Sequence, residues 1–250
     1  MAFSKIGVAV LAAGASRRFG SPKLLAPFSD ATLLDRALDA ALGCAADCAV
    51  VVTGAYHNEM LPRLIKHGAR FGGAGNAGAG ARTTAVETEG GVPFVVARNR
   101  QWESGQASSV RAAVRFARAQ DCTALLVMVA DQPRVTAAHL NALIWEYDQG
   151  RAQAYLSAND HGHGNPCLFD QSLFDDLLAL EGDEGARALF RSRRDIVARH
   201  VHFDDPYLFE DVDTRDDLAR ALRGASVESS IYGGRTHGDS LRSQKAVLHG

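Results

Sequence analysis

The sequence predicts an α/β fold in which helices flank a mostly parallel central β-sheet. Short apolar runs bounded by turn residues alternate with longer segments of helical period, which is the pattern of repeated βα units. Of the 250 residues, 46% are hydrophobic and 22% are charged, as is typical of a mixed globular domain. A chain of this length can bury about 70% of its surface, enough for one core without disulfides or metals. We therefore expect a single domain over residues 1–223.

The first half of the chain predicts four strands and three helices. The strands are apolar runs that end at turn residues, over residues 6–12, 48–53, 92–97 and 124–130. The helices have apolar residues at helical spacing, over residues 33–42, 59–67 and 108–119. Glycine makes up 8 of the 24 residues in segment 68–91, and no apolar period survives there. We interpret this segment as a flexible insertion.

The second half predicts four helices and two strands. The helices cover residues 137–147, 173–180, 184–192 and 216–222, the last with Thr214 as its N-cap. The strands cover residues 154–158 and 196–203. A loop with His161 and His163 leads into the run Pro-Cys-Leu-Phe; the pair can ligate a metal, and a mobile surface turn is the alternative. Glycine and serine are frequent from Gly224 onward, so we expect a disordered tail over residues 224–250.

Charge and hydropathy exclude two classes of partner. The formal net charge is −2, from 27 Lys and Arg against 29 Asp and Glu, so the chain lacks the basic excess of a protein that coats nucleic-acid phosphates. No apolar run approaches the ~20 residues that span a bilayer, and the apolar start runs into a Gly/Arg loop instead of a signal-peptide cleavage site. We expect no nucleic-acid partner, no membrane partner and a cytoplasmic location. Four cysteines lack the CxxC spacing of a zinc site and are expected to be reduced and buried: Cys44, Cys48, Cys122 and Cys167.

The segment after the first predicted strand is suited to holding a triphosphate. A strand that runs into a glycine-bearing turn presents backbone N–H donors, and basic side chains follow over residues 17–23. The spacing is not that of a Walker loop, because five residues separate Gly14 from Gly20, and Ser16 stands where GxGxxG needs its second glycine. A solvated basic turn is the alternative. The candidate nucleotide-binding residues of this segment are Leu11, Ala12, Ala13, Gly14, Ser16, Arg17, Arg18 and Lys23.

Two aspartates are candidate ligands of a hard cation. Asp131 directly follows the most apolar strand, and open α/β sheets place ligands at the carboxyl ends of their strands. Asp213 precedes the Thr214 cap, whereas Asp216 and Asp217 fit the first helical turn, where the helix dipole favours negative charge. Two carboxylates from distant parts of one sheet suit a Mg²⁺ ion that also holds a nucleotide. Taken alone, Asp131 is as compatible with a structural role, in a strand-ending turn or a helix cap, as with a role as a metal ligand.

A further segment opens the predicted helix that begins near residue 108. Gly105 and Ser108 lie at its start, where N–H groups and a hydroxyl can read a base or a ribose. An ordinary helix cap is the alternative interpretation.

Together these motifs resemble the MobA-like nucleotidyltransferases of molybdenum-cofactor maturation, most closely the molybdenum cofactor cytidylyltransferases. Six ordered motifs over about residues 5–223 carry the resemblance, and their order is far more specific than any single motif. The opening pattern LAAGxSxRxG with a following Lys is matched by Leu11, Ala12, Ala13, Gly14, Ser16, Arg18, Gly20 and Lys23. LADQP is matched by residues 129–133, with Val in place of Leu, and DIDTPEDL by residues 211–218. The remaining three motifs are matched by Asn99, Trp102, Gly105 and Ser109, by Gly164, Asn165 and Pro166, and by Asp183, Gly185, Ala186 and Arg187.

The resemblance implies a Rossmann-like nucleotidyltransferase fold. It implies transfer of CMP from CTP to the phosphate of molybdenum cofactor, with release of pyrophosphate and with Mg²⁺ as cofactor. The roles it implies are catalysis for Arg18, Lys23 and Asp131, metal binding for Asp131 and Asp213, and nucleotide binding for Gly105, Ser108 and Ser109 as well as the opening loop. The acceptor pocket that it implies consists of Gln132, Pro133, Gly164, Asn165, Pro166, Asp183 and Arg187. A molybdoenzyme or a chaperone is the expected recipient of the product.

One position of the opening motif bears on the nucleotide base. The family's guanylyl-transferring relatives typically carry LAGG, in which a second glycine makes room for guanine, so Ala13 favours CTP. The chain departs from the family pattern at segment 68–91, which is longer and richer in glycine, and at Arg215, where Pro is frequent. The alternatives are a guanylyltransferase, a sugar-phosphate nucleotidyltransferase, or a non-catalytic module that binds the cofactor or nucleotide and delivers it.

Overall fold

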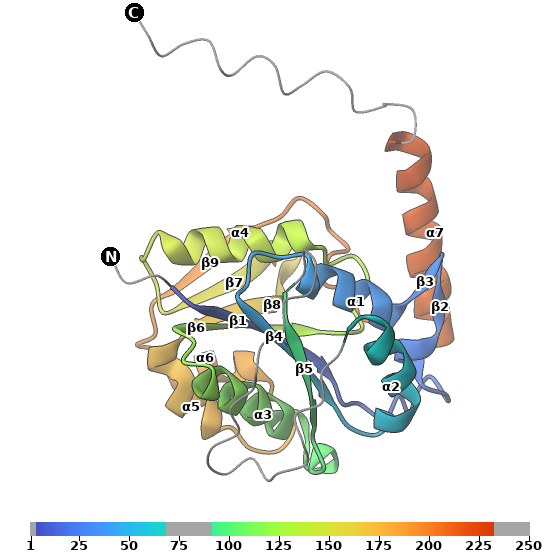
Figure 1. Ribbon diagram of the computed structural model, residues 1–250. Coiled ribbons are helices and arrows are strands. Elements are labelled where there is room, and N and C mark those ends of the chain that lie inside the picture. The colour runs from blue at the N-terminus through green and yellow to red at the C-terminus, as the bar shows by residue number, and fades with distance from the viewer. Residues whose placement is uncertain (1–3, 69–91, 233–250) are drawn as a thin grey trace, which may run out of the picture.

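The computed structural model describes residues 4–68 and 92–232, and its centre is a single twisted sheet between two layers of helices (Figure 1). All seven residues of the first strand are buried. Burial of every residue is typical of parallel sheets that helices cover on both faces. Seven strands form the sheet in the spatial order β5 (Phe94–Arg98), β4 (Cys48–Thr53), β1 (Ile6–Ala12), β6 (Ala124–Val129), β8 (Gly162–Asp170), β7 (Ala154–Asn159) and β9 (Ala198–His202).

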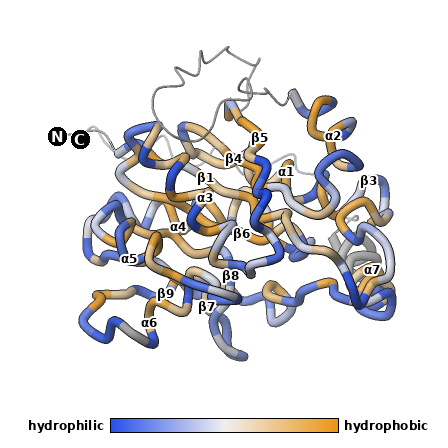
Figure 2. The backbone as a smooth tube through the Cα atoms, turned by 90° about the horizontal axis from the view of Figure 1, so that it is seen from below, coloured by the Kyte–Doolittle hydropathy of each residue, from blue (hydrophilic) through white to orange (hydrophobic). Residues whose placement is uncertain are grey.

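Alternate residues of β1 enter two separate cores. Val8 and Val10 belong to one cluster of buried side chains, and Ala9 and Leu11 belong to the other, because successive side chains of a strand point to opposite faces. The hydrophobic colour predominates in the central strands of Figure 2. The first core also contains buried residues of α1 (Leu33–Leu42), α2 (His57–Lys66), α4 (Ala137–Asp148) and α7 (Arg215–Tyr232). The second contains buried residues of α3 (Gln106–Ala119), α5 (Phe174–Leu178) and α6 (Leu189–Ser192).

The order of the strands opens a crevice at the carboxyl ends of β1 and β6. These two strands are adjacent and parallel, with Leu11 opposite Val129. From β1 the chain passes through α1 to β4, on one side of β1, whereas from β6 it passes through α4 to β7, on the other side. Adjacent parallel strands whose connections leave in opposite directions form the ligand-binding crevice of open α/β sheets. This topology therefore places a site beside Asp131.

The prediction of a mostly parallel sheet flanked by helices is confirmed. The bounds of β1, α1 and β4 coincide with the predicted ranges, because each is a clean apolar run or a helical period bounded by turn residues. The α1 helix also has the capping box that such starts favour, with Thr32 and Asp35 bonded reciprocally. All four cysteines are free and buried, as expected.

The structure corrects the prediction at the His161–His163 loop. Residues from Gly162 onward form β8, which pairs antiparallel with both β6 and β7. Glycines and a proline hide the strand period in the sequence, and the pairing with β7 shifts register between Leu156 and Ser157. His161 lies in the turn before the paired strand residue His163.

Three predicted helices also differ in form or length. The predicted helix 184–192 is a 3-10 turn, Ala186–Ala188, followed by the short α6. The predicted helix 173–180 likewise begins with a 3-10 turn, Gln171–Leu173. Helix α7 continues to Tyr232, whereas we expected the helix to end at residue 222 and a disordered tail to begin at residue 224.

The smaller elements complete the description. A short hairpin, β2 (Pro27–Phe28) and β3 (Ala31–Thr32), precedes α1, and 3-10 turns occur at Lys23–Leu25 and Trp102–Ser104. Residues 69–91, nearly all of the predicted insertion, lie outside the described part of the chain, as do residues 233–250 of the predicted tail. Over residues 4–68 and 92–232, no helix has the length and apolar character needed to cross a membrane.

A buried carboxylate, Asp35, ties the start of α1 to α2. It accepts hydrogen bonds from Thr32, from the Arg63 guanidinium at 2.6 Å and from the His67 ring, whose Nε2 lies 3.0 Å away. Burial alone would raise the pKa of Asp35, but these hydrogen bonds and the Arg63 charge hold it below its ordinary value. The ionised carboxylate therefore contributes stability above its ordinary pKa, and that contribution is lost as the pH falls through the lower pKa of the folded state.

We predict that Asp35→Ala lowers the free energy of unfolding by about 2–3 kcal/mol at pH 7, because it removes a helix cap and leaves charged partners unpaired. The difference from the parent shrinks below about pH 4, where the unfolded carboxyl is protonated. Urea unfolding at pH 7 and pH 3 measures both values. Asp39→Ala, at an exposed position of the same helix, is the matched control; an equal loss in the two variants would contradict the role of Asp35.

Candidate active site

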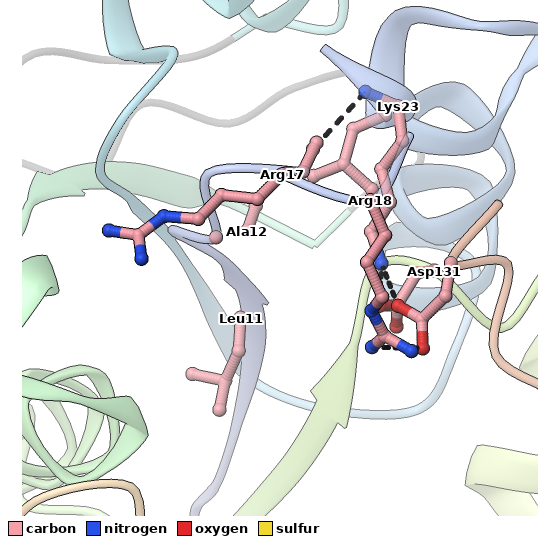
Figure 3. A pocket seen from close by; sticks show the side chains of 10 residues that line it. Leu11, Ala12, Arg17, Arg18, Lys23 and Asp131 are labelled. Carbon is pink, nitrogen blue, oxygen red and sulfur yellow. Dashed lines mark hydrogen bonds and ion pairs between the residues drawn. The ribbon is translucent and has the colours of Figure 1, made fainter. Parts of the chain in front are cut away.

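The loop after β1 forms one wall of a cavity at the crevice (Figure 3). The cavity has a volume of about 250 Å³. Its lining combines the end of β1, the basic loop and two aspartates from later in the chain: Leu11, Ala12, Gly14, Ser16, Arg17, Arg18, Lys23, Leu24, Asp131 and Asp213. Seven of the eight opening-loop residues selected from the sequence are in this set. Ala13 is buried beside it.

The backbone of this loop is folded back at Ser16. Ser16 has a positive φ of 51°, and its carbonyl oxygen accepts hydrogen bonds from the N–H groups of Phe19 and Gly20 at 3.0 and 3.1 Å. Gly20 has φ 77°, a left-handed conformation that glycine adopts without strain. The Ser16 hydroxyl accepts from Lys23 N at 3.3 Å, so the turn also fixes the start of the following 3-10 turn. The loop therefore sets where the Lys23 side chain begins.

Lys23 brings the two aspartates together. Its Nζ lies 2.7 Å from Asp131 Oδ2 and 2.9 Å from Asp213 Oδ1, and only 11% of the Lys23 side chain is exposed. Arg18 donates to the other oxygen of Asp213 at 2.7 Å, although 72% of the Arg18 side chain is exposed. Burial alone would lower the pKa of Lys23, but the two carboxylates raise it, so the ammonium stays charged. In Figure 3 Arg17 points away from this group, whereas Arg18 points toward Asp131.

The turn after β6 holds the segment that carries Asp213. Val212 N donates to the backbone carbonyl of Asp131 at 2.9 Å. The Gln132 amide donates to Asp211 Oδ1 at 2.9 Å and to the Phe209 carbonyl at 3.3 Å. Gln132, predicted to contact the acceptor, is only 5% exposed, and its amide nitrogen contacts this segment.

A capping box fixes the start of α7 directly after Asp213. Thr214 and Asp217 exchange hydrogen bonds, with Asp217 N donating to Thr214 Oγ1 at 3.2 Å and Thr214 N to Asp217 Oδ2 at 2.7 Å. Asp217 Oδ2 also accepts from Asp213 N at 3.1 Å. The predicted capping role of Thr214 is confirmed, and the same contacts fix the backbone of Asp213.

Sequence reasoning assigned no role to Asp211. Burial of its carboxyl and the neighbouring Asp131 carboxylate raise the pKa of Asp211 to about 6, even though part of the residue reaches solvent. The crowding of acidic residues over 211–217 was the signal in the sequence, but only the structure shows that Asp213 lines the cavity and that Asp211 contacts Gln132.

The residues present fit a divalent cation. Asp131 Oδ1 is buried and has no hydrogen-bond partner among the described residues, which leaves a charged oxygen available as a ligand. Mg²⁺ in nucleotide sites is bound through one or two carboxylates, with phosphates and waters as the other ligands. Within the described ranges no group of three His, Cys, Asp or Glu side chains is placed to hold a metal, so His161 and His163 lie in no such group.

The serines selected for nucleotide binding lie inside the protein. Ser108 and Ser109 are 4% and 5% exposed, and their hydroxyls accept from the Asn99 amide at 2.7 and 3.0 Å. Ser108 also donates to the carbonyl of Gly105 at 2.8 Å. Gly105 has φ 103°, and a Cβ there would collide with the backbone of Gly182. In this structure these residues join the start of α3 to Asn99, directly after β5, and to Gly182, before the 3-10 turn Ala186–Ala188; they are not part of the cavity lining.

Three candidate acceptor residues, Gly164, Asn165 and Pro166, lie in the first part of β8, which runs antiparallel to β6. The Asn165–Pro166 peptide bond is cis, and a Cβ on Gly164 would lie 2.7 Å from the Phe209 ring. Phe209 thus connects this part of β8 to the segment held by Gln132. Farther along, Pro133 is half-buried and Asp183 and Arg187 are exposed, with Arg187 donating to the carbonyl of His163 at 2.6 Å.

The arrangement is that of a nucleotidyltransferase: a basic, glycine-bearing loop faces an aspartate across the switch point of a Rossmann-like sheet. The model of the MobA-like NTP transferase domain family matches residues 8–198, and the chain belongs to this family of enzymes.

Relatives and solved structures extend the comparison over most of the chain. It is 29% identical over 230 residues to the purine catabolism protein PucB of Bacillus subtilis (strain 168), covering 88% of this chain and 97% of PucB. It is 28% identical over 220 residues to nicotine blue oxidoreductase of Paenarthrobacter nicotinovorans, covering 85% and 94%. The crystal structure of Rv0371c from Mycobacterium tuberculosis H37Rv has a TM-score of 0.68 at 29% identity, covering 89% of this chain and all of that one. A manganese complex of Rv0371c has a TM-score of 0.64 at 27% identity, covering 88% and 99%.

Two glycines near the cavity, Gly54 and Gly14, differ in how much space a side chain would find. A Cβ at Gly54 would lie 2.8 Å from the Cβ atoms of both Ala13 and Trp102, whereas a Cβ at Gly14 would meet nothing within 4 Å. We predict that Gly54→Ala costs about 1–3 kcal/mol of unfolding free energy through overpacking, and that Gly14→Ala changes it by less than about 0.5 kcal/mol. Denaturant unfolding of the two variants decides this, and equal stability of both would contradict the packing argument.

Proposed function

We propose that the protein transfers CMP from CTP to the phosphate of molybdenum cofactor and releases pyrophosphate in a Mg²⁺-dependent reaction. The observation that carries the proposal is the meeting of Lys23, Asp131 and Asp213 inside the cavity beneath the basic loop. Membership in the MobA-like family supports the reaction class. The ordered motifs of the cytidylyltransferases support molybdenum cofactor as the acceptor. Its proposed contacts are Arg187 and the segment Gly164–Pro166 in the first part of β8. We further propose a cytoplasmic reaction whose product passes to a molybdoenzyme or its chaperone.

The chemistry requires positioning and charge neutralisation. An oxygen of the acceptor phosphate attacks the α-phosphorus of CTP, forming one P–O bond while the bond to the pyrophosphate oxygen breaks. The attacking phosphate is already ionised, so no general base is needed, and alignment and electrostatic stabilisation supply the acceleration. Lys23 and Arg18 would neutralise the negative charge of the departing pyrophosphate.

Asp131 and Asp213 would hold the divalent cation, with Asp131 Oδ1 as the free ligand atom. When bound, the cation supplies further neutralisation of phosphate charge and orients the nucleotide. The manganese complex of Rv0371c shows that this structural relative accepts a divalent metal. Metal binding here would replace contacts that Lys23 makes with both carboxylates, leaving its ammonium to pair with phosphate.

The first experiment measures thermal stability with CTP, GTP, ATP and UTP, each with and without Mg²⁺, because a ligand that binds the native state stabilises it. We expect the largest Mg²⁺-dependent increase with CTP, followed by pyrophosphate release when molybdenum cofactor is added. A preference for GTP would indicate guanylyl transfer. Release with sugar phosphates alone would indicate a sugar-phosphate nucleotidyltransferase. Binding without release would indicate a module that carries cofactor or nucleotide.

We predict that Asp131→Asn lowers kcat for pyrophosphate release at least about 100-fold, because it removes the charge on which metal and phosphate positioning depend. It should also abolish the Mg²⁺ dependence of the CTP-induced thermal shift. The control is Asp216→Ala, an exposed residue in the first turn of α7, which should retain the parent's kcat. Activity of Asp131→Asn close to that of the parent would rule out the proposed metal site.

Base selection is expected to depend on residue 13. The Ala13 methyl group packs against Gly54, at which a Cβ would lie 2.8 Å from it. Its chain neighbours Ala12 and Gly14 line the cavity, so a change at residue 13 acts directly beside the proposed nucleotide site. We predict that Ala13→Gly lowers the kcat/KM ratio of CTP over GTP about 10-fold, the discrimination that a contact of one methyl group supplies. Competition between the two nucleotides in one reaction measures the ratio directly. An unchanged ratio would place base selection elsewhere.

A further inference from the structure

Arg215 joins the first turn of α7 to the loop that carries Arg18. Its guanidinium carbon lies 5.3 Å from the centroid of the Phe19 ring, within the range of a cation–π contact. A nitrogen of the same guanidinium lies 3.5 Å from Ser21 Oγ, at the outer limit of a hydrogen bond. Arg215 therefore contacts the loop on both sides of Gly20, where the backbone is left-handed.

Phe19 is the anchor of this loop. Its neighbours Arg17, Arg18 and Gly20 are exposed, whereas only 4% of Phe19 is exposed. The ring belongs to the core cluster shared by α1 and α7. Because Arg215 is exposed and lies over this ring, its guanidinium covers the one apolar side chain by which residues 17–20 are fixed to the core.

The two arginines bridge the loop and the helix in opposite directions. Arg18 extends from the loop to Asp213, at 2.7 Å, and Arg215 extends from the position two residues after Asp213 back to Phe19. Both contacts therefore join the same loop to the same end of α7. A movement of the loop that breaks one contact would also strain the other. The family pattern frequently has Pro where this chain has Arg215, and Pro carries no group that could make either contact.

We propose that Arg215 is a positioning residue that holds the loop of residues 16–21 against α7 and so keeps Arg18 and Lys23 directed at the nucleotide phosphates. This inference rests on the proposed function for its effect on turnover. The contact itself can be tested without turnover, because the loop contains the trypsin-sensitive bond after Arg18.

The test compares the parent with Arg215→Gln, Arg215→Lys and the control Arg223→Gln, which changes an exposed arginine farther along the same helix. Brief trypsin digestion of the folded protein, followed by mass spectrometry, measures the rate of cleavage after Arg18. We expect Arg215→Gln to speed cleavage and to raise KM for CTP, each about two- to fivefold, the range of an exposed cation–π contact, with kcat nearly unchanged. Arg215→Lys should recover part of both effects, and Arg223→Gln should match the parent.

A second background shows whether the effect passes through Phe19. In Phe19→Leu the ring is absent, so adding Arg215→Gln should change the cleavage rate no further. Parent-like cleavage in Arg215→Gln would overturn the proposal, as would a higher KM with unchanged cleavage, which would mean direct contact with the nucleotide. If the parent releases no pyrophosphate with any nucleotide, the proposed function fails, and the cleavage rates still decide the role of Arg215.

Discussion

The site depends on one buried cation shared by two carboxylates. Lys23, Asp131 and Asp213 come from the first part, the middle and the last part of the described chain, and the Lys23 ammonium contacts both carboxylates within 2.9 Å. Two carboxylates do not stay close together and ionised without a neighbouring positive charge. The ammonium is therefore what permits the end of β6 and the start of α7 to meet at the loop after β1.

The scaffold makes this meeting specific. The switch of chain direction between β1 and β6 opens the crevice, and the Asp131 backbone carbonyl receives Val212 N, so the segment before α7 is attached to the end of β6. Gln132 adds a buried amide to the same attachment. Backbone and buried amide contacts thus place the Asp213 carboxylate. Its ion pair with the exposed Arg18 guanidinium then stabilises a position that is already determined.

The fold of this chain agrees with its family, whereas the contact made by Arg215 departs from the family pattern. The mostly parallel sheet flanked by helices agrees with membership in the MobA-like family, whose model matches residues 8–198. The two curated relatives have names that refer to purine catabolism and to an oxidoreductase, so the argument for a molybdenum-cofactor acceptor rests on the ordered motifs. Arg215, whose guanidinium lies over the Phe19 ring, stands where this chain departs from the family pattern.

The sequence by itself determined the parts whose signal is local. The buried period of β1, the capping box of α1 and the Thr214 cap are each set by residues within a few positions of one another, so their bounds or roles could be predicted. The basic loop and Asp131 were also visible, because strand ends and glycine turns are local features. Strand β8 was missed because its glycines and proline conceal the period, and its pairing with β6 and β7 stabilises it through contacts distant in sequence.

The tertiary structure alone decided which polar side chains are available to a ligand. Ser108, Ser109 and Gln132 have the chemistry of ligand-binding groups, yet their hydrogen bonds go to Asn99 and to the segment before α7. Conversely, the sequence spacing of 108 residues between Lys23 and Asp131 concealed an ion pair. The reason is physical: a side chain's composition sets the bonds it can form, but only packing brings a buried partner close enough to satisfy them.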